Sequence, residues 1–311
     1  MSVHLVTGGA GFIGSHLVHA LAREGHRVRV LDDLSQGNVA NLDPLSDRVE
    51  FVRGDVRDLE CVRRAAQGVE VVFHHAALAS VSRSVDDPRA THDVCVTGTV
   101  NVLLAAKEAG VRRVVYAASS SAYGGADPPS HEGQLPATMS PYAAAKLAGE
   151  YYCSSFTHVF GLETVRLRYF NIFGPRQDPN SPYSAVIPLF ICAMLKGQPP
   201  TIFGDGRQSR DFTYIDNVVH ANLLAATARG VSGNVYNVGT GVAASLLDLI
   251  AHLNAILGAT MAPTHAPDRP GDVRLSKADL TRATAELGYR PQVNLEEGLR
   301  RTAAYYRATT P

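Results

Sequence analysis

Short apolar runs alternate with helix-like patterns through the first half of the chain. Residues 69–73 and 113–117 are almost continuously apolar, as strands are when both faces of their sheet are covered. The intervening segments have apolar residues at helical spacing. The pattern predicts strands over 3–7, 28–32, 49–53, 70–74, 112–118 and 162–168, and helices over 11–24, 58–67, 88–109 and 141–159. This alternation predicts an α/β fold with a doubly wound parallel sheet.

The pattern becomes irregular after Phe173. Residues 174–182 contain three Pro together with Gly, Asp, Asn and Ser, and these turn residues predict a loop. Helices are predicted near 184–195, 216–229, 245–257 and 294–308, with a turn at 203–206. We expect residues 1–173 to form one domain, to which 211–238 return, and 174–311 to form mostly a smaller C-terminal substrate-binding lobe. That lobe should cover the carboxyl ends of the strands, where open α/β sheets bind ligands.

Charge and cysteine usage narrow the class of protein. The 311 residues include 29 Lys and Arg against 29 Asp and Glu, so no net field attracts nucleic acid or an anionic membrane, and neither is expected as a partner. Four scattered cysteines lack metal-binding spacing, so we expect reduced thiols and no metal. No apolar run has bilayer length, and a strand pattern from residue 3 leaves no room for a signal peptide. A cytoplasmic protein is expected.

A glycine-rich turn follows the first predicted strand. Gly9-x-Gly11-x-x-Gly14 opens a helix, and Asp32 ends the next strand eighteen residues after Gly14. This is the Rossmann-like dinucleotide pattern in its proper context. Glycines let a pyrophosphate approach the N-terminus of the helix. A carboxylate at Asp32 accepts ribose hydroxyls and repels a 2′-phosphate, which favours NAD over NADP. The alternative is an ordinary glycine-rich turn.

A second pattern places a phenol beside an ammonium group. Tyr142 and Lys146 are four residues apart in a helix that begins after Ser140-Pro141, so they share one face. A nearby cation is expected to lower the pKa of Tyr142, which suits a general base. Ser119 lies at the carboxyl end of the predicted strand 112–118, where catalytic groups of such sheets project. The alternative is a chance pairing in an alanine-rich helix.

Together these motifs resemble the extended short-chain dehydrogenases/reductases, and within them the UDP-hexose 4-epimerases. The resemblance covers essentially the whole chain. It is carried by Thr7-Gly8-x-x-Gly11-x-x-Gly14, by Ser119 with Tyr142-x-x-x-Lys146, and by the sequence RYFNIFGP at 168–175. It implies 4-epimerisation of UDP-Glc/UDP-Gal through a transient 4-keto sugar, with NAD regenerated in each cycle.

The resemblance also implies roles for individual residues. The implied catalytic residues are Ser119, Tyr142 and Lys146. The implied NAD-binding residues are Gly8, Gly11, Phe12, Ile13, Gly14, Asp32, Asp33, Asp55, Val56, Ala76, Ala77, Tyr142 and Lys146. The implied substrate-binding residues are Ser119, Tyr142, Asn171, Arg210, Arg269, Asp272 and Ser276. Two arginines for a diphosphate also match charge-assisted recognition of such a group.

Three positions bear on substrate choice and on the active-site network. A bulky residue at the position of Ser276 limits the sugar pocket in this family, so the small serine implies acceptance of UDP-GlcNAc/UDP-GalNAc as well. Alternatively, Ser276 is a helix N-cap. Cys95 stands where many members have Asn, and Ala79 stands where some have Lys.

Related enzymes and a non-catalytic protein are the alternatives to UDP-hexose 4-epimerisation. A 4,6-dehydratase needs an acidic pair at the positions of Ser120 and Ser121, which argues against that reaction. A UDP-glucuronate 4-epimerase, another nucleotide-sugar-modifying enzyme of this kind and, more remotely, a non-catalytic NAD-sensing regulator stay open. The resemblance further implies a homodimer formed through the helices at 94–109 and 143–159.

Overall fold

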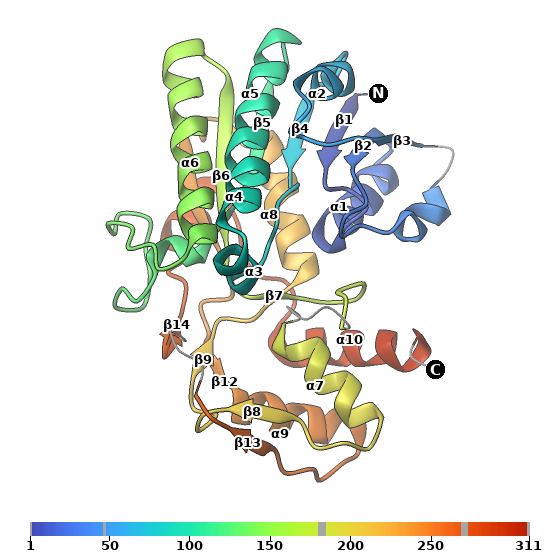
Figure 1. Ribbon diagram of the computed structural model, residues 1–311, viewed down its shortest axis with the longest axis vertical. Helices are drawn as coiled ribbons and strands as arrows, with labels where there is room; N and C mark the ends of the chain where they lie inside the picture. The colour runs from blue at the N-terminus through green and yellow to red at the C-terminus, as the bar shows by residue number, and fades with distance from the viewer. Residues whose placement is uncertain (1, 46–47, 180–184, 269–272, 310–311) are drawn as a thin grey trace.

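The computed structural model describes residues 2–45, 48–179, 185–268 and 273–309. Within these ranges a sheet of seven strands has the order β11-β6-β5-β4-β1-β2-β3 (Figure 1). All neighbouring strands in it are parallel. The strands are β1 (Val3–Thr7), β2 (Arg27–Asp32), β3 (Val49–Arg53), β4 (Val71–His74), β5 (Arg113–Ser119), β6 (Glu163–Tyr169) and β11 (Asn234–Val238). The predicted α/β fold is confirmed, and each predicted strand lies within one residue of its expected ends.

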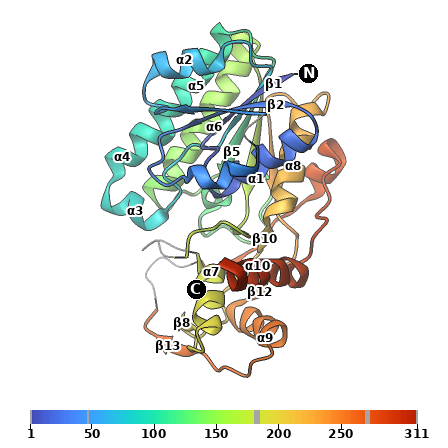
Figure 2. The ribbon, with the colours of Figure 1, turned by 90° about the vertical axis from the view of Figure 1, so that its right-hand side faces the viewer.

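Helices cover both faces of this sheet (Figure 2). One face carries α2 (Leu59–Ala66), α5 (Gly98–Glu108) and α6 (Pro141–Phe160), and the other carries α1 (Phe12–Arg23) and α8 (Ile215–Thr227). Successive residues of a strand point to opposite faces, so Leu5 of β1 joins one apolar core and Val6 the other. This two-sided burial explains the nearly continuous apolar runs.

Distorted or short helices complete this part of the chain. They are a 3-10 helix at Val39–Leu45, α3 (Val81–Asp86), α4 (Pro88–His92), a π-helical turn at Asp93–Thr97 and a 3-10 turn at Ser120–Tyr123. The segment expected as one helix over 88–109 is therefore α4, the π-helical turn and α5 in succession.

The C-terminal lobe contains the expected helices and several strand pairs that the sequence did not indicate. The helices are α7 (Val186–Leu195), α9 (Leu246–Leu257) and α10 (Leu295–Thr309), with a π-helical turn at Ala283–Leu287. The paired strands are β7 (Ile172–Phe173), β8 (Thr201–Phe203), β9 (Ser209–Arg210), β10 (Thr213–Tyr214), β12 (Ala244–Ser245), β13 (Thr264–Ala266) and β14 (Leu275–Ser276). Strand β9 pairs with both β12 and β14, β10 with β7, and β13 with β8.

One apolar core extends from the sheet into this lobe. It includes Leu17 of α1 and Ala221 of α8, and it continues through Phe190 of α7, Leu249 of α9 and Leu299 of α10. Because α8 and β11 follow the first C-terminal segments in sequence, the chain leaves the sheet after β6 and returns to it. The two parts are therefore joined by packing as well as by the chain.

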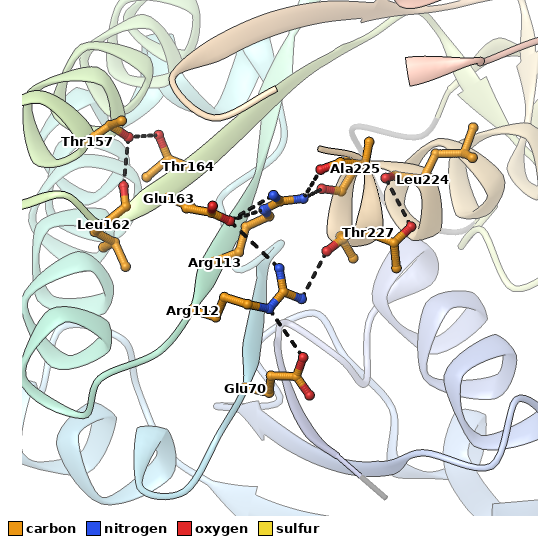
Figure 3. A network of polar contacts seen from close by, with 12 residues as sticks. Glu70, Arg112, Arg113, Thr157, Leu162, Glu163, Thr164, Leu224, Ala225 and Thr227 are labelled. Carbon is orange, nitrogen blue, oxygen red and sulfur yellow. Dashed lines mark hydrogen bonds and ion pairs between the residues drawn. The ribbon is translucent and has the colours of Figure 1, made fainter. Parts of the chain in front are cut away.

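A polar network links the C-terminal end of α8 to the amino-terminal ends of β5 and β6 (Figure 3). Arg113, at the start of β5, is almost fully buried and pairs with Glu163 at 2.7 Å. Its Nη1 donates to the carbonyls of Ala225 and Ala228, both at 2.8 Å. A cation at the C-terminal carbonyls of a helix also interacts favourably with the helix dipole.

None of the helices in the described ranges combines the length and the apolar character required to cross a bilayer.

Candidate active site

The turn between β1 and α1 has the shape of an anion-binding cradle. Gly8 has a φ of +69°, and a Cβ there would lie 2.8 Å from the backbone nitrogen of Ala76. A Cβ on Gly14 would lie 2.2 Å from the carbonyl oxygen of Gly8. Gly11 is the N-cap of α1 and supplies no side-chain cap, and the first turn has no acidic residue. The amide of Ala10 in this turn donates to Asp32, whereas the N-terminus of α1 has neither a side-chain cap nor an acidic residue, which fits the pyrophosphate of NAD. Phe12, Ile13 and Gly14 form the first turn of α1.

Asp32 is held at the end of β2 by backbone donors. Its Oδ2 accepts from the amide of Ala10 at 3.0 Å, and its Oδ1 accepts from the amide of Leu34 at 2.8 Å. Burial raises the pKa of Asp32, and these two hydrogen bonds oppose the rise. A carboxylate has about four acceptor sites, so two remain for ribose hydroxyls. The neighbouring Asp33 is exposed.

The remaining positions expected to line NAD lie at the same edge of the sheet. Asp55 follows β3 and forms a two-point ion pair with Arg57, which lowers the pKa of Asp55. Val56 is buried against Gly98 of α5. Ala76 and Ala77 follow β4, and the amide of Ala76 donates to the hydroxyl of Thr7 at 3.2 Å. Strand β4, which Ala76 and Ala77 follow, pairs with β1, which leads into the glycine turn.

Ser119, Tyr142 and Lys146 meet where β5 ends against the start of α6. Ser119 is the last residue of β5, and its Oγ accepts a hydrogen bond from the hydroxyl of Ser121 at 2.8 Å. Helix α6 begins at Pro141, with Ser140 as its N-cap. This places Tyr142 in the first turn and Lys146 one turn later. Lys146 is almost fully buried, and its Nζ donates to the carbonyl of Ala117 at 2.8 Å.

The pKa values at this site show the influence of burial. Burial raises the pKa of Tyr142 above its ordinary value, Cys95 adds to the rise, and a hydrogen bond with Ser119 opposes it. The expected lowering beside Lys146 is therefore not found in the protein alone. The Lys146 ammonium is turned toward Ala117 and the ring of Tyr116, 5.0 Å from its centroid. Burial also lowers the pKa of Lys146.

Cys95 lies directly beside this group. It is in the π-helical turn Asp93–Thr97, is almost fully buried, and packs with Ala145 of α6. Single π-helical turns are frequent at functional sites. The carbonyl of Cys95 accepts a hydrogen bond from Thr99, which in turn contacts the ring of His74. The thiol of Cys95 therefore occupies the position at which many members of the family that this sequence resembles have an asparagine.

Three of the positions expected to bind substrate, Asn171, Arg210 and Ser276, come together around β9. Arg210 of β9 pairs in register with Ser276 of β14. The side chain of Asn171 donates to the carbonyl of Asp211, next to Arg210, at 3.3 Å. Ser276 lies in a strand, and no helix starts at the residue after it, so it is not a helix N-cap. Arg269 and Asp272 lie outside the described residues.

Three buried polar groups near the site were not singled out by their sequence. Glu150, one turn after Lys146, forms a fully buried two-point ion pair with Arg168. The ring of Tyr123 packs on the Arg168 guanidinium, and its hydroxyl donates to Asn237 at 2.7 Å. The carboxylate of Asp211 is also fully buried. The i, i+4 spacing of Lys146 and Glu150 was the only sequence signal for the first of these.

Residues 4–239 match the family described as "NAD dependent epimerase/dehydratase family". The chain belongs to the NAD-dependent epimerase/dehydratase family. NAD is its cofactor, and it is an enzyme of the isomerase class, as the sequence predicted. The family includes dehydratases as well as epimerases.

Individual relatives cover nearly the full chain. A UDP-glucose 4-epimerase of Mycolicibacterium smegmatis is 43% identical over 97% of this chain and 98% of its own. The solved UDP-glucose 4-epimerase of Thermotoga maritima, with UDP-glucose, has a TM-score of 0.94 at 39% identity, covering 99% and 100% of the two chains. A UDP-N-acetylglucosamine 4-epimerase of Methanobrevibacter ruminantium, in complex with UDP-N-acetylmuramic acid, has a TM-score of 0.95 at 37% identity, covering 99% of each.

Proposed function

We propose that the protein interconverts the 4-epimers of UDP-hexoses, both UDP-Glc/UDP-Gal and UDP-GlcNAc/UDP-GalNAc, through a transient 4-keto sugar. The observation that carries this proposal is the meeting of Ser119, Tyr142 and Lys146 at the end of β5, two strands away from the end of β1 that leads into the glycine cradle. The relatives named as UDP-sugar 4-epimerases support the substrate class.

Each protein group has a defined task in this reaction. The phenolate of Tyr142 takes the proton of the sugar 4-hydroxyl and later returns a proton to the 4-oxygen. The Ser119 hydroxyl donates a hydrogen bond to that oxygen. Lys146, already fixed by Ala117, has two further N–H groups for ribose hydroxyls. Bound at the glycine cradle, NAD⁺ would supply the reversible hydride chemistry at C4 and a positive charge.

The pocket residues support the assignment of the substrate. We assign the diphosphate to Arg210 and Asn171, with Arg269 as a second guanidinium and Asp272 on the uridine ribose. Ser276, paired in register with Arg210, has a small side chain. A small residue leaves room for an N-acetyl group. We assign NAD to 1–173 with 211–238, and the nucleotide sugar mostly to the remainder of 174–311.

One structural feature separates this function from 4,6-dehydration, and an experiment separates it from glucuronate epimerisation. Ser121 donates to Ser119 at the position where a dehydratase needs an acid, and a hydroxyl cannot eliminate water in that way. UDP-glucuronate 4-epimerisation is distinguished by experiment. Incubation with UDP-Glc, UDP-GlcNAc and UDP-GlcA separately, followed by NMR, should show 4-epimers of the first two. Epimerisation of UDP-GlcA alone would select the glucuronate activity.

The chemical step is tested by Tyr142→Phe. We expect kcat to fall by about 10²- to 10⁴-fold, the usual contribution of a positioned acid–base group, with NAD content unchanged. Full activity of this variant would refute the role of Tyr142. A wild-type protein that holds NAD but epimerises no UDP-sugar would refute the proposed function and favour a NAD-sensing role.

We also propose that the protein forms a homodimer through α5 and α6. Helix α6 exposes Tyr151, Val159 and Phe160, whose exposed fractions are 58%, 65% and 50%. Large apolar side chains grouped on one helix favour burial against a partner. Sedimentation equilibrium should give twice the mass of the chain, and Tyr151→Arg should shift it toward the monomer. A wild-type monomer at micromolar concentration would refute the dimer.

A further inference from the structure

Asp211 has a fully buried carboxylate that accepts four hydrogen bonds. Its Oδ1 accepts from the amide and the hydroxyl of Thr240, both at 2.7 Å. Its Oδ2 accepts from the amides of Gly241 at 2.9 Å and Ala278 at 3.2 Å. Burial raises the pKa of Asp211, and these bonds oppose the rise. All four donors are neutral groups, so the position of the carboxylate depends on their geometry.

These donors come from two different parts of the molecule. Thr240 and Gly241 follow β11, the edge strand of the large sheet, whereas Ala278 follows β14 of the C-terminal lobe. Asp211 itself lies between β9 and β10. A Cβ on Gly239 would lie 2.8 Å from Oδ2 of Asp211, so a glycine is needed for this close approach. The carboxylate therefore ties the β9–β14 pair to the end of the sheet.

The backbone of Asp211 contacts the residues assigned to the substrate. Its amide donates to the carbonyl of Ser276 at 2.8 Å. Its carbonyl accepts from the side chain of Asn171 at 3.3 Å. Arg210 precedes it and pairs in register with Ser276. Three residues of the proposed pocket, distant from one another in sequence, thus meet at one residue whose side chain is fixed.

We propose that Asp211 is a positioning residue that sets the mutual placement of Arg210, Asn171 and Ser276 and thereby the affinity for the nucleotide sugar. The proposal rests on the proposed function, because it takes these three residues as the substrate pocket. Charge-assisted hydrogen bonds are about twice as strong as neutral ones. A buried acceptor that loses its donors is also costly. The substrate pocket should therefore respond to Asp211, while the NAD cradle at α1 should not.

The test compares Asp211→Asn with a matched control. In the variant an NH₂ group replaces one oxygen and faces amide donors. Asp205→Asn is the control, since Asp205 is in the same lobe and forms an exposed ion pair with Arg274. Binding of UDP to the NAD-loaded proteins is measured by calorimetry. We expect Asp211→Asn to raise the Kd for UDP by about tenfold or more. The Kd of this variant for NAD, and the Kd of the control for UDP, should stay within about threefold of wild type.

Steady-state kinetics separate positioning from a general loss of structure. KM for UDP-Glc should rise with the Kd for UDP, while kcat at saturation stays within about threefold, because Ser119 and Tyr142 do not contact Asp211. An unchanged Kd for UDP, or an equal loss of NAD affinity, would overturn the proposal. If wild type binds UDP but turns over no UDP-sugar, the proposed function fails, and the calorimetric Kd for UDP still decides the role of Asp211. If wild type does not bind UDP, the proposed function and the positioning role of Asp211 both fail.

A second pair of variants, at Thr240, tests the positioning role of Asp211 if Asp211→Asn does not fold. Thr240→Val removes one donor to Oδ1, and Thr240→Ser retains it. The valine variant should raise the Kd for UDP about threefold or more, and the serine variant should match wild type. Equal affinities of the two variants would overturn the proposal.

Discussion

At the scale of single residues, Tyr142 is subject to opposing influences on its pKa. Burial and Cys95 raise it, and the hydrogen bond with Ser119 lowers it. Lys146 is close in sequence but directs its ammonium to Ala117. A phenol that stays protonated until the cationic cofactor is bound fits an acid–base group that acts only in the loaded enzyme.

Ser276 provides a prediction about substrate choice. In Ser276→Tyr the side chain becomes much larger at a position paired with Arg210, which should exclude an N-acetyl group but leave space for a hydroxyl. We expect turnover of UDP-GlcNAc to fall by at least about 100-fold while turnover of UDP-Glc stays within about tenfold. Coupled assays on both sugars measure the ratio, with Ser276→Ala as the small-residue control. An unchanged ratio would contradict the pocket assignment.

Gly14 provides a prediction about the cofactor. A Cβ at Gly14 would lie 2.2 Å from the Gly8 carbonyl, which is backbone and cannot move aside without opening the turn. Gly14→Ala should therefore be purified without NAD, measured by absorbance and by release on denaturation. Gly125→Ala is a suitable control, because its Cβ would meet only Met139 Sδ, at 3.8 Å. Retention of NAD by Gly14→Ala would show that the turn tolerates the change.

The residues of the site differ in how far sequence alone can find them. Gly14, Tyr142 and Lys146 belong to short motifs in which spacing along one turn or helix carries the chemistry. The sequence gives no role to Asp211, because the donors that hold its carboxylate belong to Thr240 and Ala278, which are 29 and 67 residues away. Contacts at such separations leave no local pattern.

At the scale of elements, the same distinction appears. Six of the seven strands of the large sheet were predicted because burial on both faces leaves long apolar runs, whereas for β11 only the return of 211–238 to the sheet was expected. The strands β7, β9, β10, β12 and β14 have two residues each, too short for any period to show. The π-helical turn Asp93–Thr97 has helical spacing in sequence, so the sequence predicted one continuous helix there.

The end of α8 provides a stability prediction. Arg113→Met removes the ion pair with Glu163 and both hydrogen bonds to α8 carbonyls, in a nearly buried environment. The free energy of unfolding should fall by about 2–4 kcal/mol. Arg112→Met is the control in the same network (Figure 3), because Arg112 is exposed and should contribute about 1 kcal/mol or less. Urea unfolding measures both, and equal losses would contradict the burial argument.

At the scale of the whole molecule, buried histidines set the response to acid. Burial lowers the pKa of His4 to about 4 and that of His16 and His75 to about 3. Burial also lowers the pKa of His74, whose ring nitrogens contact Thr7 and Thr99. These rings stay neutral in the folded protein, whereas the unfolded chain binds protons near pH 6.5. Stability is therefore retained above about pH 6.5 and lost as the pH falls toward 4.

His74→Gln tests this dependence. Each histidine that ionises only in the unfolded chain contributes a slope of at most about 1.4 kcal/mol per pH unit. The variant should lower the slope of the unfolding free energy between pH 6.5 and 4 by about that amount. His92→Gln, on the exposed side of α4, serves as the control. The slopes are obtained from urea titrations at several pH values, and a slope equal to wild type in His74→Gln would contradict the prediction.

The core that runs from α1 and α8 into α7, α9 and α10 has a consequence for recombination between relatives. A chimaera that exchanged everything after residue 173 would replace α8 and β11, and with them one covering helix and one edge strand of the large sheet. Sugar preference cannot be transplanted as a block at that boundary. A workable exchange keeps 211–238 with the first half of the chain and crosses over on both sides of it, so that the parental packing around α8 is inherited intact.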